Sequence, residues 1–151
     1  MFTIRFDMRA PAFGAPTTEL YAAAIDMSAW AEQHGCLAAV LCEHHGSEDG
    51  YLPAPLLLAS AMAARTDRLA LSLVVILPFH DPVRLAEEIA VLDLISAGRA
   101  SYVFGLGYRR RNSSTSVSTW RSGADWPTRT SISYGRCSPV PPSRARTAAS
   151  R

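Results

Sequence analysis

Three short apolar segments begin 32 residues apart, at residues 37, 69 and 101, and this regular spacing restricts the fold more than any other feature. A fourth segment, 2–8 (FTIRFDM), alternates apolar and polar residues and starts 35 residues before the first of them. Such an interval accommodates a strand, a crossover helix and the next parallel strand. Continuous apolar strands are typical of parallel sheets that are covered on both faces. The pattern predicts the α/β class, and it leaves open whether the sheet is doubly wound or closed into a barrel.

Helices are predicted in the three intervals, at 18–34, 55–65 and 81–95. Gly35 follows the first of them, at a position that favours a left-handed residue. Asp81 and Pro82 begin the third, as an N-cap and a first-turn proline. The periodicity of the first helix places six residues on its buried face: Leu20, Ala23, Ala24, Met27, Trp30 and Ala31.

The net charge of +2 hides a division of the chain at Tyr108. Residues 1–108 contain six arginines and twelve acidic residues, whereas 109–151 contain nine arginines and one acidic residue. In the second segment 28 of 43 residues are Ser, Thr, Arg or Pro, and leucine is absent, so it has too little apolar surface to offset the entropy of ordering. We therefore predict that 1–108 is the folded domain and that 109–151 is a disordered tail.

Several classes of protein are disfavoured. The longest apolar runs, 52–64 and 69–77, are shorter than the roughly 18 residues of a membrane span. Charged residues interrupt the first nine positions, which is unlike a secretory leader. Three cysteines are an odd number without metal-type spacing, so we expect neither a disulfide framework nor a metal site. The expected location is the cytoplasm.

Polar residues that could perform chemistry follow the predicted strands. Glu43-His44-His45 comes directly after 37–42, at the carboxyl end where α/β folds place their active sites. One of the histidines suits acid/base chemistry, because imidazole titrates near neutrality, and a loop pair bonded only to backbone is the structural alternative. The 78–84 segment (PFHDPVR) is better explained as a helix cap followed by a solvated arginine. The Gly105-Leu106-Gly107 sequence allows close approach of a ligand but is a weak signal alone.

In this order, the EHH segment, the 74–99 stretch (VVILPFHDPVRLAEEIAVLDLISAGR) and the GLG strand resemble the luciferase-like flavin monooxygenase family. The resemblance covers residues 2–108 and implies the N-terminal half of a TIM (β/α)8 barrel, with four parallel strands and three helices. It implies a small organic substrate and a flavin, FMN or a deazaflavin coenzyme, at the carboxyl-end mouth. His44 would act in oxygen or acid/base chemistry. A cis peptide at about Leu73-Val74 would lie behind the flavin, and Gly105 and Gly107 would face its ring.

The second half of such a barrel, which contains most of the family's phosphate-binding groups, is not found in this sequence. We interpret the tail as the product of a frameshift between Tyr108 and Arg111. In the shifted frame the codon across Asp125 and Trp126 must encode Leu and the next must encode Ala, and an amphipathic helical pattern becomes possible. The resemblance then implies an enzyme by descent that is weak or inactive in this truncated form.

Two non-enzymatic functions are alternatives. The nine tail arginines could bind nucleic acid through its phosphates, although they are scattered after Arg111 and the frameshift accounts for them, so we do not expect this partner. A half-barrel could instead self-associate to cover its open edges. The sequence leaves open the substrate, the choice between FMN and deazaflavin, and the choice between oxygen insertion and hydride transfer.

Overall fold

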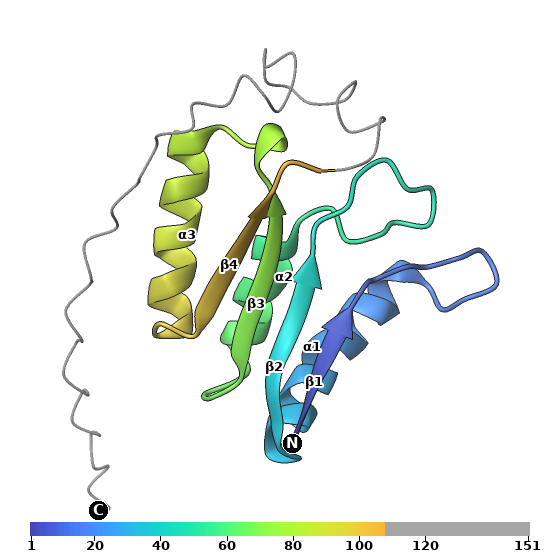
Figure 1. Ribbon diagram of the computed structural model, residues 1–151. Helices are drawn as coiled ribbons and strands as arrows, with labels where there is room; N and C mark the ends of the chain where they lie inside the picture. The colour runs from blue at the N-terminus through green and yellow to red at the C-terminus, as the bar shows by residue number, and fades with distance from the viewer. Residues whose placement is uncertain (108–151) are drawn as a thin grey trace, which may run out of the picture.

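Four parallel strands alternate with three helices in residues 1–107, the part of the chain that the computed structural model describes (Figure 1). The predictions for 109–151, a disordered tail and a changed reading frame, lie outside the described residues. The elements are β1 (Phe2–Phe6), α1 (Thr17–Gln33), β2 (Cys36–Cys42), α2 (Pro55–Ala63), β3 (Ala70–Ile76), a 3-10 turn η1 (Leu77–Phe79), α3 (Pro82–Ser96) and β4 (Ala100–Gly105). Every predicted strand and helix is therefore present, with bounds displaced by up to two residues.

The strands lie in the order β1-β2-β3-β4, so each strand pairs with its neighbour in sequence. In Figure 1, α1 and α2 lie behind the sheet, and α3 contributes Leu85, Ile89 and Leu92 to the same core. In a doubly wound fold, helices cover both faces of the sheet. The order of the strands across the sheet also changes direction at one point, so it differs from their order in the sequence. Sequential order with helices on one face is the arrangement of half a (β/α)8 barrel, which decides between the two predicted architectures.

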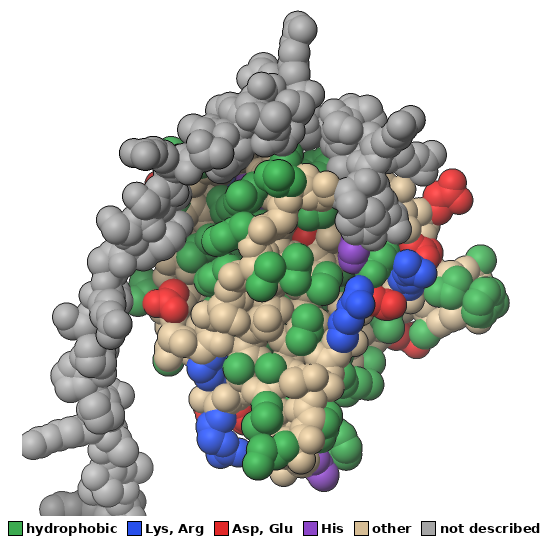
Figure 2. Space-filling view, viewed as in Figure 1, with side chains coloured by type: hydrophobic (Ala, Val, Ile, Leu, Met, Phe, Trp, Pro, Cys, Tyr) green, Lys and Arg blue, Asp and Glu red, His purple; other side chains and the backbone are tan. Residues whose placement is uncertain are grey.

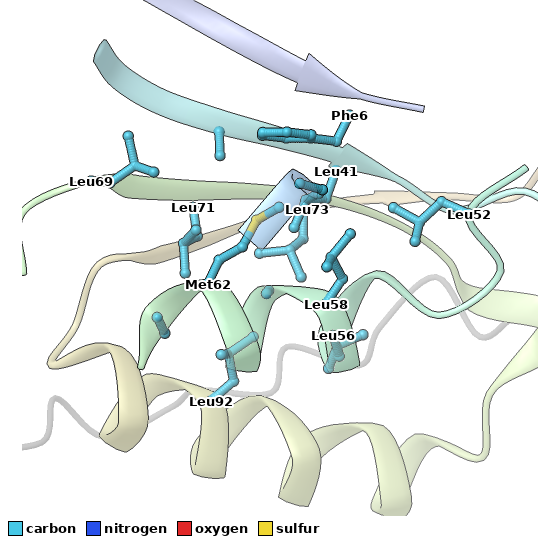
Figure 3. Close-up of a cluster of buried hydrophobic side chains, with 14 of the residues drawn as sticks. Phe6, Leu41, Leu52, Leu56, Leu58, Met62, Leu69, Leu71, Leu73 and Leu92 are labelled. Atoms are coloured by element: carbon cyan, nitrogen blue, oxygen red, sulfur yellow. The ribbon is translucent and has the colours of Figure 1, made fainter. Parts of the chain in front are cut away.

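The core lies between the sheet and the helices (Figure 3). Leu41, Leu71 and Leu73 point from β2 and β3 toward α2 and are fully buried. Leu58 and Met62 of α2 meet them, and α2 is apolar on nearly all sides because it also packs against both other helices. At about 25 cal/mol per Å² of apolar surface, each such leucine stabilises the fold by roughly 1.5–3 kcal/mol.

The predicted buried face of α1 is partly wrong. Ala24, Ser28 and Ala31 are the buried residues, whereas Met27 and Trp30 are 46% and 56% exposed. Ala23, also predicted to be buried, is exposed, so the buried face consists of small residues only. Burial of Ser28 costs little, since its hydroxyl donates a 2.7 Å hydrogen bond to the Ile25 carbonyl.

Two polar side chains fix the turns at the amino end of the sheet. Glu32, near the end of α1, accepts hydrogen bonds from the consecutive backbone N–H groups of residues 67–69. The guanidinium of Arg99 donates to the carbonyls of Ala63, Thr66 and Leu69, to the Thr66 hydroxyl and to the Ser96 carbonyl. These contacts tie α1, α2 and the start of β4 to the α2–β3 turn.

No helix covers the second face of the sheet within residues 1–107, and this face is turned toward the viewer in Figure 2. Near the carboxyl ends of the strands, this face carries Cys42, Val74 and Val103, which are paired across β2, β3 and β4. The Val103 side chain is 56% exposed. None of the helices described in residues 1–107 is long and apolar enough to cross a membrane.

Candidate active site

The carboxyl ends of β2 and β3 bring together two polar loops that are far apart in sequence. Residues 43–45 follow β2, and His80 follows the turn η1 after β3. The Glu43 N–H donates to the Val74 carbonyl at 2.9 Å, and the His44 N–H donates to the Leu52 carbonyl at 2.9 Å. The first bond extends the pairing of β2 with β3 by one residue, and the second ties His44 to the loop that contains Leu52. Together they fix the backbone of residues 43–45.

Glu43 is the centre of a buried cluster. Its carboxylate is fully buried and accepts a 2.7 Å hydrogen bond from the Ile76 N–H. Nε2 of His45 lies 2.5 Å from Oε1, and Nε2 of His80 lies 3.0 Å from both carboxylate oxygens. The His45 ring also packs against Phe79, with ring centroids 4.0 Å apart. A buried carboxylate requires such partners, because an unpaired charge is costly to bury.

The contacts change the protonation of this cluster. Burial raises the pKa of the Glu43 carboxyl, but the hydrogen bonds from His45, His80 and the Ile76 N–H outweigh it, so the pKa lies below the ordinary glutamate value. The hydrogen bond with Glu43 raises the pKa of His80 above the ordinary histidine value, against the opposing effect of burial. Both directions favour a carboxylate paired with an imidazolium near neutral pH.

His44 belongs to a different set of contacts. Its ring stacks on Tyr51, with centroids 3.6 Å apart and an interplanar angle of 27°. The buried Tyr51 hydroxyl accepts a 2.8 Å hydrogen bond from Arg5, and the Arg9 guanidinium lies 4.2 Å from the Tyr51 ring centroid. The two adjacent histidines thus make separate contacts, with His45 bound to Glu43 and His44 placed against an aromatic ring.

The residues predicted to surround the flavin are distributed over both faces of the sheet. Leu73 is fully buried in the helix-side core, so its side chain is not on the open face. Val74 is half-buried on the opposite face, in register with Cys42 and Val103. The expected cis peptide near Leu73 and Val74 is absent, because residues 1–107 contain only trans peptides. A trans peptide is about 3–4 kcal/mol lower in free energy than a non-proline cis peptide, and it allows β3 to pair with the strands on both sides.

The two predicted glycines end β4 at the same edge of the sheet. Gly105 lies opposite Ile76, and a Cβ added there would meet atoms only at 3.9 Å, so packing does not require glycine. Gly107 has φ of 77°, which strongly favours glycine. Both lie at the carboxyl end, where the EHH segment also lies.

The 78–84 segment confirms one prediction and adds a residue that the sequence did not single out. Asp81 caps α3 through hydrogen bonds from the Val83 and Arg84 N–H groups, and Arg84 is exposed beside Glu88, as expected. His80, however, joins the Glu43 cluster. Glu43 and Tyr51 were likewise assigned no role, although Glu43 was visible as the first residue of EHH. Among the described residues, no group of three or more His, Cys, Asp or Glu side chains is arranged to hold a metal ion.

Comparison with known proteins adds a family. Residues 4–129 match the family described as luciferase-like monooxygenase. The alkanal monooxygenase beta chain of Photobacterium leiognathi is 43% identical over 65 residues, which are 42% of this chain and 19% of that protein. The 4-hydroxyprotoasukamycin monooxygenase of Streptomyces nodosus subsp. asukaensis is 32% identical over 84 residues, 55% and 23% of the two chains.

Solved structures agree with the fold. The monooxygenase RslO1 from Streptomyces bottropensis superposes with a TM-score of 0.69 at 30% identity, over 75% of this chain and 35% of that one. The oxygenating constituent of a Pseudomonas putida diketocamphane monooxygenase, in complex with FMN, gives 0.67 at 24% identity over 75% and 31%, a likeness of fold. The chain spans about a quarter of the length of two further curated relatives, both uncharacterized proteins of Sinorhizobium fredii.

Proposed function

This chain belongs to the luciferase-like monooxygenase family, and we propose that it forms the part of a flavin-dependent monooxygenase mouth that contacts the flavin ring. One observation supports this most directly. The EHH segment after β2 and the two glycines at the end of β4 lie at the same end of one parallel sheet, the end formed by the carboxyl ends of the strands (here called the carboxyl edge). In barrels of this architecture, active sites lie at that end.

The residues at this edge fit a flat, largely apolar ring. Cys42, Val74 and Val103 form a row of small apolar side chains on the uncovered face, and Gly105, two residues beyond Val103 in β4, adds no side chain. We propose FMN, or a deazaflavin coenzyme, as the cofactor and a small organic molecule as the substrate. When bound, the flavin supplies the redox chemistry. The chain's own contribution is the apolar surface and the neighbouring imidazole.

We assign that imidazole to His44. Its stacking on Tyr51, which Arg5 fixes through the hydroxyl, gives the ring one orientation at the mouth. An oriented imidazole can take up or release a proton near neutral pH, and losing such a group typically lowers the rate about 100-fold or more. In a version of the protein with its reading frame restored, His44→Ala should lower turnover by about that factor. His34→Ala, at the exposed carboxyl-terminal end of α1, is the matched control. Unchanged turnover in His44→Ala contradicts the assignment.

For the 151-residue chain itself we propose weak flavin binding and low activity. The Arg5 and Arg9 side chains of the first strand and its loop are engaged with Tyr51 and Asp49, which leaves the ring contacts as the main source of affinity at this edge. Titration of the purified chain with FMN, followed by flavin fluorescence, tests this. We expect no saturation in the low micromolar range, and a micromolar or tighter complex contradicts the proposal.

We also propose that the segment from Arg109 onward is translated from a shifted reading frame. The forced Leu and Ala codons in the alternative frame, together with the absence of leucine from 109–151, support this. Sequencing the locus again is the test. A single missing or additional base between Tyr108 and Arg111 is the expected result, whereas confirmation of the present reading contradicts it.

A further inference from the structure

The two residues that flank His44 in sequence belong to a cluster of titratable side chains that has no role in the function proposed above. Three titratable side chains meet at one carboxylate oxygen: Oε1 of Glu43 is 2.5 Å from Nε2 of His45 and 3.0 Å from Nε2 of His80. The carboxylate is fully buried, whereas the two imidazoles are 23% and 21% exposed. A single buried anion thus connects two histidines that both reach solvent.

The cluster is fixed by the backbone on each side. The Ile76 N–H donates to Oε2 of Glu43 at 2.7 Å, and the Glu43 N–H donates to the Val74 carbonyl at 2.9 Å. The ring of Phe79 packs against His45 at 4.0 Å. Because the carboxylate is held by backbone groups, both histidines can change protonation while its position stays the same.

The charges around the cluster favour one proton shared by two imidazoles. One carboxylate charge stabilises one imidazolium, and a second imidazolium at the same oxygen would be repelled by the first. On the η1–α3 side, Glu88 adds negative charge that favours protonated His80, and Glu88 is itself paired with the exposed Arg84 at 2.7 Å. Asp81, beside His80 in sequence, is engaged in capping α3. The geometry therefore suits a single proton that either imidazole can hold at the shared carboxylate.

We propose that Glu43, His45 and His80 form a proton relay at the carboxyl ends of β2 and β3. In one direction His45 starts as the neutral tautomer protonated at Nδ1. The N–H bond of His80 Nε2 then breaks, an O–H bond to Glu43 forms and breaks, and an N–H bond to His45 Nε2 forms. The carboxylate ends as it began, and one positive charge has moved from His80 to His45. The relay needs no metal and no change of oxidation state. That the relay supplies a proton to the flavin site rests on the proposed function. That the three side chains exchange a proton does not.

The test is a pH titration of the full 151-residue chain labelled with nitrogen-15 at histidine and followed by nuclear magnetic resonance, with no flavin present. We expect the titration curve of His80 to show two macroscopic steps, because a second imidazole lies at the same carboxylate oxygen. In Glu43→Gln the pKa of His80 should fall toward its ordinary value. In His45→Gln the curve of His80 should reduce to a single step. His34, exposed at the amino end of the sheet, is the internal control, and its signals should not differ between the wild type and the variants.

Two results overturn the relay: a single-step His80 curve that is unchanged by His45→Gln, or a His80 pKa that is unchanged by Glu43→Gln. If Glu43→Gln does not fold, His45→Gln decides alone, because its ring is partly exposed and its replacement keeps a neutral donor beside Glu43. Because flavin is absent throughout, a negative result here is distinct from failure of the flavin site, which the FMN titration measures.

Discussion

Arg99 offers the sharpest test of what stabilises the described part of the chain. Its guanidinium donates five hydrogen bonds, at 2.7–2.9 Å, to four backbone carbonyls and the Thr66 hydroxyl, and no carboxylate is among these partners. Arg99→Met removes all five donors while keeping the apolar stem. A hydrogen bond to a charged group contributes about 1.5–3 kcal/mol, and the cost of desolvating the cation and the partial return of water offset much of the sum. We expect a net loss of about 3 kcal/mol.

For a domain of this size, such a loss lowers the thermal midpoint by roughly 12–20 °C. Urea denaturation of the wild type and Arg99→Met, at one protein concentration, measures the free energy of unfolding. Arg99→Lys should recover only part of it, because a point-like ammonium cannot reproduce the five-bond fork. Arg68→Met, in the exposed part of the neighbouring turn, is the matched control and should change stability by less than about 0.5 kcal/mol. If Arg99→Met and Arg68→Met have equal stability, the reasoning about this fork is wrong.

Two further predictions concern stability and association. Burial raises the pKa of Glu32, but the N–H groups of residues 67–69 lower it by more, so its net pKa is depressed and its stabilising contribution is present above the ordinary glutamate pKa. The stability gap between wild type and Glu32→Gln should therefore be present at pH 7 and should close as the pH falls below about 4, and a gap that widens in acid contradicts this. Because the described sheet has β1 and β4 at its edges and one uncovered face, we predict concentration-dependent self-association in size-exclusion chromatography with light scattering. A monodisperse 16.3 kDa species with cooperative unfolding would contradict that prediction.

The secondary structure was predictable because it depends on local patterns. The apolar runs at 37–42 and 69–77 and the Asp81 cap gave the strands and a helix start directly. The residue pattern alone could not decide between a barrel and a doubly wound sheet, since the choice depends on which face each crossover helix covers, and only the family resemblance predicted the barrel. The exposure of Met27 and Trp30 was also missed, because periodicity ranks apolar size, whereas packing favoured the small Ser28 with its satisfied hydroxyl.

The sequence predicted where the site lies but not which side chains contact one another there. The position of EHH at a strand end follows from the order of the elements. The contact between Glu43 and His80 spans 37 residues and exists only because β2 and β3 are paired in register. Likewise, the separation of His44 from His45 depends on Tyr51, whose loop returns to the sheet through the bond between the His44 N–H and the Leu52 carbonyl.

The central claim, a flavin-ring site at the carboxyl edge, is tested most directly by mapping where flavin touches the chain. Backbone amide chemical shifts of the nitrogen-15-labelled protein can be followed during addition of FMN to millimolar concentration, which detects weak binding. We predict that the perturbed amides cluster at 43–45, at Val74 and at Gly105 and Gly107. Amides at the opposite end of the sheet, such as Gly35 and Arg99, should remain unchanged. Shifts concentrated at that amino end, or no shifts at millimolar FMN, would contradict the claim.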